Sequence, residues 1–136
     1  ITSSIGGMAS ASIPATSRNT NSSILFLTGH NTNGEMPDDI NWQAVSKIPV
    51  VVMYMAIKHL PIIAQRLIKE GRSSQDCVAV IQDATLPSER ILESKLIKIN
   101  SDIEKNQIKA PAIVVLGPVV GVRSKLIQNV IKDAIN

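Results

Sequence analysis

Residues 49–71 read PVVVMYMAIKHLPIIAQRLIKEG, and this stretch decides the fold class. Its first part, Pro49 to Met55, is a continuous β-branched run that predicts a strand buried on both faces. Its second part predicts a helix, because these side chains fall on one face at helical spacing: Leu60, Ile63, Ala64, Leu67 and Ile68. Pro61 suits the first turn of that helix, and Gly71 suits the position just after its end.

The same alternation of strands and helices continues on both sides of this stretch. Further strands are expected at Ile24 to Leu27, Cys77 to Ile81, Arg90 to Lys95 and Pro111 to Leu116. Helices are expected in the small-residue segment before Ala15, at Asn41 to Ser46 with Asn41 as cap, around Ile99 and Ile103, and in the tail. The tail carries an apolar stripe: Leu126, Ile127, Val130, Ile131, Ala134 and Ile135. The pattern predicts a layered α/β domain.

Composition excludes several classes of protein. The 136 residues fit one domain, and 44% hydrophobic against 2% aromatic residues predicts an aliphatic core. The net charge of +3 comes from scattered basic residues, and Phe26, Trp42 and Tyr54 are too few for base stacking, so nucleic-acid binding is not expected. No apolar stretch reaches membrane-spanning length and the first residues lack the pattern of a signal peptide, so no membrane partner is expected.

Cysteine and histidine content gives no sign of a metal centre. The one cysteine, Cys77, favours a reducing compartment and hence a cytoplasmic location, and its apolar surroundings predict a small buried side chain. His30 and His59 lie far apart in the sequence and make a poor zinc set with a single cysteine, so we expect no metal.

Ligands of α/β sheets gather at the carboxyl ends of strands. Three segments follow predicted strands and are therefore candidates for a ligand site: residues 28–30, 54–56 and 82–85. No dinucleotide-binding glycine motif, phosphate-binding loop or nucleophile elbow is present. His30 could position an anionic substrate or cap a loop, Met55 could be core filler, and Arg18 could be solvated. The residues alone predict a ligand site and no reaction.

Seven stretches, in order and at compatible spacings, resemble the C-terminal half of the tetrapyrrole methylases, with the branch that C-methylates uroporphyrinogen III most similar. The chain opens with Ile1-Thr2-Ser3-Ser4, similar to the family's P-G-[IV]-T-[AS]-[AS]. Residues 23–30 resemble its S-[VI]-x-[FL]-[VI]-T-G-H, and Val51 to Ala56 resembles its [VL]-V-x-Y-M-G. The other similar stretches are residues 12–18, 41–46, 78–85 and 111–120, so the match spans roughly residues 1–126.

The resemblance implies a single layered α/β domain with a mixed central sheet of about five strands flanked by helices. It also implies transfer of methyl groups from S-adenosylmethionine to uroporphyrinogen III and precorrin-1, giving precorrin-2 for sirohaem and cobalamin synthesis, with S-adenosylhomocysteine as the other product. By carry-over, Thr2, Ser3, Met55, Ala84 and Ala112 would bind the cofactor, and Arg18, His30 and Met55 the carboxylate-rich substrate. Arginine suits that task because its planar fork grips carboxylates in pairs. No nucleophilic side chain is required, since holding the two reactants in line contributes most.

Some positions depart from the family pattern. Ser17 replaces a histidine, and Pro118 replaces a glutamate. Gln82-Asp83 replaces a Glu-Asn pair. Ala56 replaces a glycine, which adds a methyl group beside the expected cofactor. The family's N-terminal G-x-G-P-G-D loop is absent, so we expect the chain to need an N-terminal domain of the same protein and to be inactive alone.

We expect residues 1–126 to be the domain and residues 127–136 a helical tail that could serve a homodimer interface. Two other functions stay open: another precorrin methyltransferase of the same superfamily, or a non-catalytic α/β dimerisation module.

Overall fold

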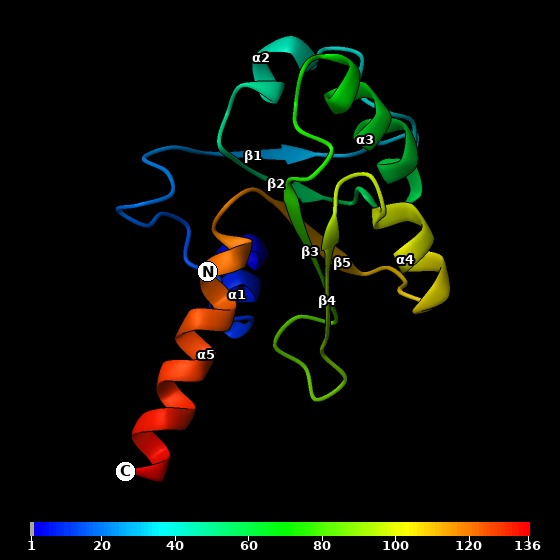
Figure 1. Ribbon diagram of the computed structural model, residues 1–136. Coiled ribbons are helices and arrows are strands. Elements are labelled where there is room, and N and C mark those ends of the chain that lie inside the picture. The colour runs from blue at the N-terminus through cyan, green and yellow to red at the C-terminus, as the bar shows by residue number, and fades with distance from the viewer. Residues whose placement is uncertain (1) are drawn as a thin grey trace.

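The structure is a computed structural model that describes residues 2–136. Five strands and five α-helices, with one short 3₁₀ helix, alternate along these residues (Figure 1). The strands are β1 (Ile24–Thr28), β2 (Val50–Tyr54), β3 (Cys77–Gln82), β4 (Arg90–Lys95) and β5 (Ala112–Leu116). The helices are α1 (Ser3–Ser10), α2 (Trp42–Ser46), η1 (Ile57–His59), α3 (Leu60–Lys69), α4 (Ile99–Lys105) and α5 (Val120–Ile135).

The five strands form one mixed sheet in the order β1-β2-β5-β3-β4, which confirms the expected α/β fold. β1 and β2 are parallel, whereas β5 lies between β2 and β3 and is antiparallel to both. β4 pairs antiparallel with β3 at the edge. β1, β2 and β3 therefore run in one direction. β5 runs in the opposite direction, so its first residue lies at the carboxyl ends of those three strands.

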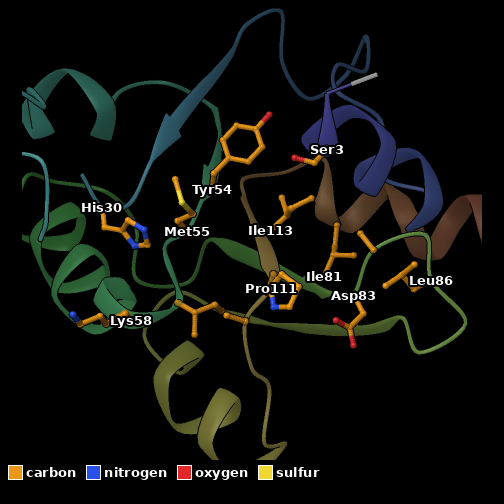
Figure 2. A pocket seen from close by; sticks show the side chains of 14 residues that line it. Ser3, His30, Tyr54, Met55, Lys58, Ile81, Asp83, Leu86, Pro111 and Ile113 are labelled. Atoms are coloured by element: carbon orange, nitrogen blue, oxygen red, sulfur yellow. The ribbon is translucent and has the colours of Figure 1, made fainter. Parts of the chain in front are cut away.

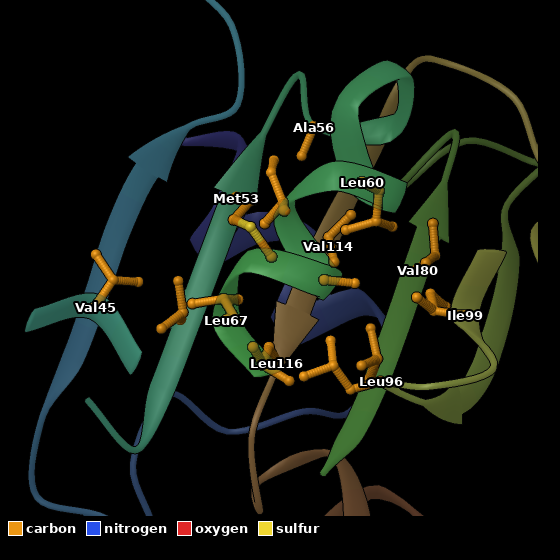
Figure 3. Packing of buried hydrophobic residues seen from close by; sticks show 14 of the residues in the cluster. Val45, Met53, Ala56, Leu60, Leu67, Val80, Leu96, Ile99, Val114 and Leu116 are labelled. Carbon is orange, nitrogen blue, oxygen red and sulfur yellow. The ribbon is translucent and has the colours of Figure 1, made fainter. Parts of the chain in front are cut away.

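Helices cover both faces of the sheet, and the alternation of side chains along each strand separates two cores. Val51 and Met53 of β2 join the core beneath α2, α3 and α4, shown in Figure 3. Val50 and Val52, one position away, join Met8 of α1 on the opposite face, where α5 also begins. Because the central strands are buried on both faces, their sequences read as continuous apolar runs.

The helix signals read from the sequence are borne out in detail. Asn41 caps α2, with its Oδ1 accepting a hydrogen bond from the Ala44 amide at 3.0 Å. Pro61 lies in the first turn of α3, and Gly71 follows the end of that helix with φ +102°, a conformation that glycine adopts without strain. Asn41 thus marks the start of α2, and Pro61 and Gly71 mark the start and the end of α3.

Helix α1 packs very closely against the sheet, as its small residues predicted. A Cβ built on Gly7 would lie 2.6 Å from Ile113 Cδ1 and 3.0 Å from Ala84 Cβ. Any larger residue at position 7 would have to displace the Ile113 side chain and shift α1 slightly away from Ala84.

Three expectations about individual residues need correction. Cys77 is half-buried rather than buried, because it begins β3 beside the edge strand, where Lys95 Nζ lies 3.2 Å from its sulfur. β2 ends at Tyr54, one residue earlier than expected, because Met55 turns the chain with φ +49°. The methyl of Ala56 does not face a ligand site: a Cβ on Gly29 would lie 2.7 Å from it, and Ala56 is fully buried.

The C-terminal helix leaves the body of the molecule (Figure 1). α5 begins at Val120 and is continuous to Ile135, so it runs across the expected boundary between residues 126 and 127. Its apolar stripe is largely exposed, as the exposed fractions show: Leu126 42%, Val130 68%, Ile131 53% and Ile135 79%.

Candidate functional site

The three candidate segments, residues 28–30, 54–56 and 82–85, lie together at the end of the sheet formed by the carboxyl ends of β1, β2 and β3. They follow β1, β2 and β3, which are mutually parallel and end together. The segment before β5 joins them, because that strand starts at the same end. Two backbone hydrogen bonds continue the ladder here, from the Gly29 amide to the Tyr54 carbonyl at 2.7 Å and from the Asp83 amide to the Pro111 carbonyl at 3.1 Å. Backbone groups beyond these bonds can offer donors and acceptors to a ligand.

A pocket lies at this end of the sheet, and its volume of about 630 Å³ is within the size range of small-molecule sites. Five residues predicted as site residues line it: Ser3, His30, Met55, Ala84 and Ala112. They come from segments far apart in the sequence. Figure 2 shows Ser3 and Asp83 on one side of the pocket and His30 and Lys58 on the other.

Nine lining residues were not predicted as site residues. They are Tyr54, Ile57, Lys58, Ile81, Asp83, Leu86, Ala110, Pro111 and Ile113. Tyr54 and Asp83 lay within the candidate strand-end segments, so their position was a usable signal. Lys58, in η1, and Leu86, in the connection between β3 and β4, lie beyond those segments and had no such signal. The unpredicted side chains are mostly apolar, which suits a ligand with a flat or apolar part.

The Tyr54 hydroxyl joins the end of β2 to the start of α1. It shares hydrogen bonds with the hydroxyls of Ser4 and of Thr2, the latter at 2.6 Å. Burial raises the pKa of the Tyr54 phenol, but the hydrogen bonds from Ser4 and Thr2 outweigh burial, and the net pKa lies below its usual value. The cluster fixes the N-terminus of α1 beside the pocket.

Backbone strain gathers at the pocket. Met55, Asp83 and Thr85 have φ of +49°, +50° and +71°, a region that non-glycine residues rarely occupy. Met55 is 52% exposed although it follows a fully buried strand. Non-glycine residues keep such conformations where surrounding contacts enforce them, and these positions are often functional.

His30 presents an unsatisfied polar atom. Among residues 2–136, its buried Nδ1 has no hydrogen-bond partner. Its ring lies edge-on to that of His59, with centroids 6.5 Å apart. His59 is held in turn, because its Nε2 donates to the Gly34 carbonyl at 2.9 Å, and Lys58 Nζ donates to the same carbonyl at 3.2 Å. A buried nitrogen without a partner is costly in free energy, and packing alone does not explain one in a residue that lines the pocket.

Two predicted site residues do not line the pocket. Thr2 touches it only through its hydrogen bond to Tyr54. Arg18 is exposed in the turn where Ser17 and Asn21 form an isolated bridge. The structure therefore brings together five of the seven predicted positions, counted by comparing the predicted residues with the lining residues.

Within residues 2–136, no three His, Cys, Asp or Glu side chains lie together as a metal site would require. In the same part of the chain, no helix combines the length and apolar character needed to cross a bilayer.

The family is decided by a direct match. The family model described as Tetrapyrrole (Corrin/Porphyrin) Methylases matches residues 1–100. The chain belongs to the tetrapyrrole methylases. This confirms the resemblance on which the site residues were predicted.

Individual methylases are also similar to the chain. It is 46% identical over 127 residues to the uroporphyrinogen-III C-methyltransferase of a Sinorhizobium species, covering 93% of this chain and 45% of that protein. It is 39% identical to the siroheme synthase of Azotobacter vinelandii, covering 93% of this chain and 27% of that protein. The chain thus spans less than half the length of these relatives.

Solved methylase structures share the fold. The uroporphyrin-III C-methyl transferase of Thermus thermophilus, complexed with S-adenyl homocysteine, superposes with a TM-score of 0.73 at 24% identity, covering 85% of this chain and 50% of that one. A cobalt precorrin-4 methyltransferase superposes with a TM-score of 0.76 at 17% identity, covering 86% and 49%.

Proposed function

We propose that this chain is the C-terminal half of an enzyme that uses S-adenosylmethionine to C-methylate uroporphyrinogen III through precorrin-1 to precorrin-2. The observation that carries the proposal is the convergence of Ser3, His30, Met55, Ala84 and Ala112 on one pocket. These residues belong to family motifs that lie far apart in the sequence. Motif residues that served only the core would not be expected to meet at one ligand-sized cavity.

The pocket fits S-adenosylmethionine by size and chemistry. Its 630 Å³ lie in the range of small-molecule sites. Apolar side chains such as Ile81 and Ile113 offer a surface for an adenine ring, and the Ser3 hydroxyl and strand-end backbone groups offer partners for polar atoms. When bound, the cofactor supplies an electrophilic methyl group on a sulfonium.

Positioning is the main task of the residues on this chain. Met55 and Ala84 follow β2 and β3, so their backbone groups are held by a rigid sheet. The sheet order places Ala112 at the same end, because β5 runs antiparallel to both neighbours. Holding cofactor and pyrrole carbon in line lowers the barrier by removing the entropy of bringing them together.

His30 and Arg18 are proposed to contact the substrate. His30 lines the pocket, and an imidazole N–H can donate a hydrogen bond to a carboxylate. Arg18 is exposed, and its guanidinium can grip a carboxylate with two parallel hydrogen bonds. Met55, at the pocket mouth, would touch both reactants.

The part of the protein beyond this chain completes the proposal. The chain spans 45% of its Sinorhizobium relative, and we propose that an N-terminal domain supplies the rest of the cofactor site. The chain alone is then inactive. The domain comprises residues 1–126, and residues 127–136 form a tail. The protein acts in the cytoplasm as a homodimer.

A fusion tests the activity directly. The N-terminal part of the Sinorhizobium relative is joined to residues 1–136 and incubated anaerobically with uroporphyrinogen III and S-adenosylmethionine, and the product is weighed by mass spectrometry. We expect the gain of one and then two methyl groups from the fusion, and none from the chain alone. A matched pair of variants, Met55→Ala and Ile62→Ala, separates pocket from surface: only Met55→Ala should slow the reaction, since Ile62 is an exposed residue of α3.

Other outcomes identify the alternatives. Binding of S-adenosylhomocysteine without methylation of uroporphyrinogen III would favour another precorrin methyltransferase, to be found by offering later corrinoid precursors. Absence of both binding and transfer would contradict the proposal. The exposed apolar stripe of α5 would then favour the non-catalytic dimerisation module, with sedimentation of the chain as its measurement.

A further inference from the structure

The connection between β3 and β4 carries part of the pocket wall but little regular structure. Ala84 and Leu86 line the pocket from this connection. Asp83 and Thr85, on either side of Ala84, both have positive φ. Two backbone hydrogen bonds close the segment on itself, from the Leu86 amide to the Asp83 carbonyl and from the Glu89 amide to the Leu86 carbonyl, each 3.0 Å long. A third bond, from the Asp83 amide to the Pro111 carbonyl at 3.1 Å, anchors the start of the segment to the chain before β5, and none of the three bonds involves Thr85.

The carboxylate of Glu89 supplies a bond to Thr85. Its Oε2 accepts a hydrogen bond from the Thr85 amide at 2.7 Å and a second, short one from the Ser10 hydroxyl. The first bond folds the connection back on itself. The second joins it to the last residue of α1. One oxygen atom thus ties the turn that carries Ala84 to the helix whose first residue is Ser3.

The geometry around this carboxylate excludes an ordinary surface ion pair. Within residues 2–136, no basic side chain lies within salt-bridge distance of Glu89, although Arg90 is its neighbour. Arg90 instead donates to the Asn106 carbonyl at 2.8 Å. Hydrogen bonds to a charged acceptor are roughly twice as strong as neutral ones, so the two donors on Glu89 are well suited to hold the connection.

We propose that Glu89 is a positioning residue of the cofactor site, acting through the Thr85 amide and the Ser10 hydroxyl. The proposal rests on the proposed function, because it takes the pocket to be the cofactor site. Glu89 does not line the pocket. It fixes Ala84 relative to Ser3, at the place where Gly7 already brings α1 within contact distance of Ala84.

The first test measures positioning without any ligand. Amide hydrogen exchange of the 136-residue chain is followed by NMR for the wild type and for Glu89→Gln and Glu89→Ala. The Thr85 amide should be protected in the wild type and in Glu89→Gln, whose amide oxygen can still accept, and should lose protection in Glu89→Ala. Equal protection of Thr85 in all three proteins would overturn the proposal.

The second test measures binding of S-adenosylhomocysteine by calorimetry. Glu89→Ala should weaken binding by about tenfold, and Glu89→Gln should restore most of it, because glutamine keeps an acceptor for the Thr85 amide. The control is Glu104→Ala, an exposed glutamate of α4, which should bind like the wild type.

The outcomes separate the two proposals. If the wild type binds and Glu89→Ala binds equally well, Glu89 is not a positioning residue and the proposed function stands. If the wild-type chain and the fusion both fail to bind, the proposed function fails, and loss of Thr85 protection in Glu89→Ala then shows only that Glu89 orders the turn.

Discussion

Tyr54 shows how one side chain joins elements that lie far apart in the sequence. It is the only tyrosine of the chain, so its ionisation can be followed by absorbance near 295 nm without interference from other tyrosines. Its hydroxyl bonds to Ser4 and Thr2 at the start of α1. Those bonds lower the pKa of the phenol beyond the rise that burial causes.

We expect Tyr54 to titrate below pH 10 in the folded chain and near pH 10 in concentrated urea. Because the folded-state pKa is the lower one, ionisation of Tyr54 stabilises the fold. That contribution is complete above the unfolded-state pKa and is lost as the pH falls through the folded-state pKa. The contribution therefore appears as the pH rises through the folded-state pKa, on the alkaline side of the Tyr54 titration. Ser4→Ala should move the folded midpoint upward, and an unchanged midpoint would show that the hydroxyl cluster does not control the phenol.

Arg72 was not identified from the sequence, because an arginine beside glycine and two serines is typical of a solvated loop. The structure buries it, with 7% of the residue exposed. Its guanidinium donates to the carbonyls of Ile48 and Pro49 and to Asp76, the last at 2.8 Å. Those carbonyls belong to the connection before β2, more than twenty residues away, and sequence periodicity carries no information on such a partner.

Replacing Arg72 by alanine should lower the free energy of unfolding by about 3 kcal/mol, because buried carbonyls and a carboxylate lose their donors together. Urea unfolding followed by the fluorescence of the single tryptophan, Trp42, measures this. The control is Arg66→Ala, whose side chain is 54% exposed and pairs only with Glu70, and whose cost should be under about 0.5 kcal/mol. Equal costs for the two variants would contradict the structural role of Arg72.

Two glycines in helices are expected to respond in opposite ways to the same change. Gly7→Ala places a Cβ against Ile113 and Ala84 and should destabilise the chain by about 1–3 kcal/mol, despite the better helix propensity of alanine. Gly121→Ala in α5 meets nothing within 4 Å and should stabilise by up to about 1 kcal/mol. Thermal unfolding of both variants decides this, and a stabilising Gly7→Ala would show that α1 is not held so closely.

Most elements could be predicted from the sequence because their signals are local. The apolar run before Met55, the cap at Asn41 and the glycine at position 71 each act within a few residues of themselves. The position of β5 between β2 and β3 could not be predicted this way, because all three strands have the same buried pattern and no local signal gives their order.

The pocket was predictable to a similar extent. Met55 and Ala84 follow strands and match family motifs. Lys58 and Leu86 line the pocket because of the path that the chain takes after β2 and β3, and no local signal gives that path. Arg18 matches a motif yet does not line the pocket. Its position could not be predicted, because the order of the motifs does not encode the distance of a loop from the sheet.

At the scale of the molecule, the last part of α5 should be dispensable for stability. From Ser124 onward the residues of α5 are mostly exposed, and within residues 2–136 the last side-chain hydrogen bond from α5 to the body is that of Arg123, whose Nε donates to the Ala11 carbonyl at 2.9 Å. Deleting residues 127–136 should therefore change the free energy of unfolding by less than about 1 kcal/mol and reduce self-association through the apolar stripe. Urea unfolding and sedimentation measure the two effects. A large loss of stability would contradict the proposed division at residue 126.

The sheet order also has a consequence for the chain during its synthesis. β5 is the last strand to leave the ribosome, yet it is the strand that joins β1-β2 to β3-β4. Until residues 112–116 emerge, the nascent chain holds two separate strand pairs, each with an open inner edge able to pair wrongly. A chain that stops shortly before β5 should therefore be prone to aggregate, because its two strand pairs lack the strand that joins them.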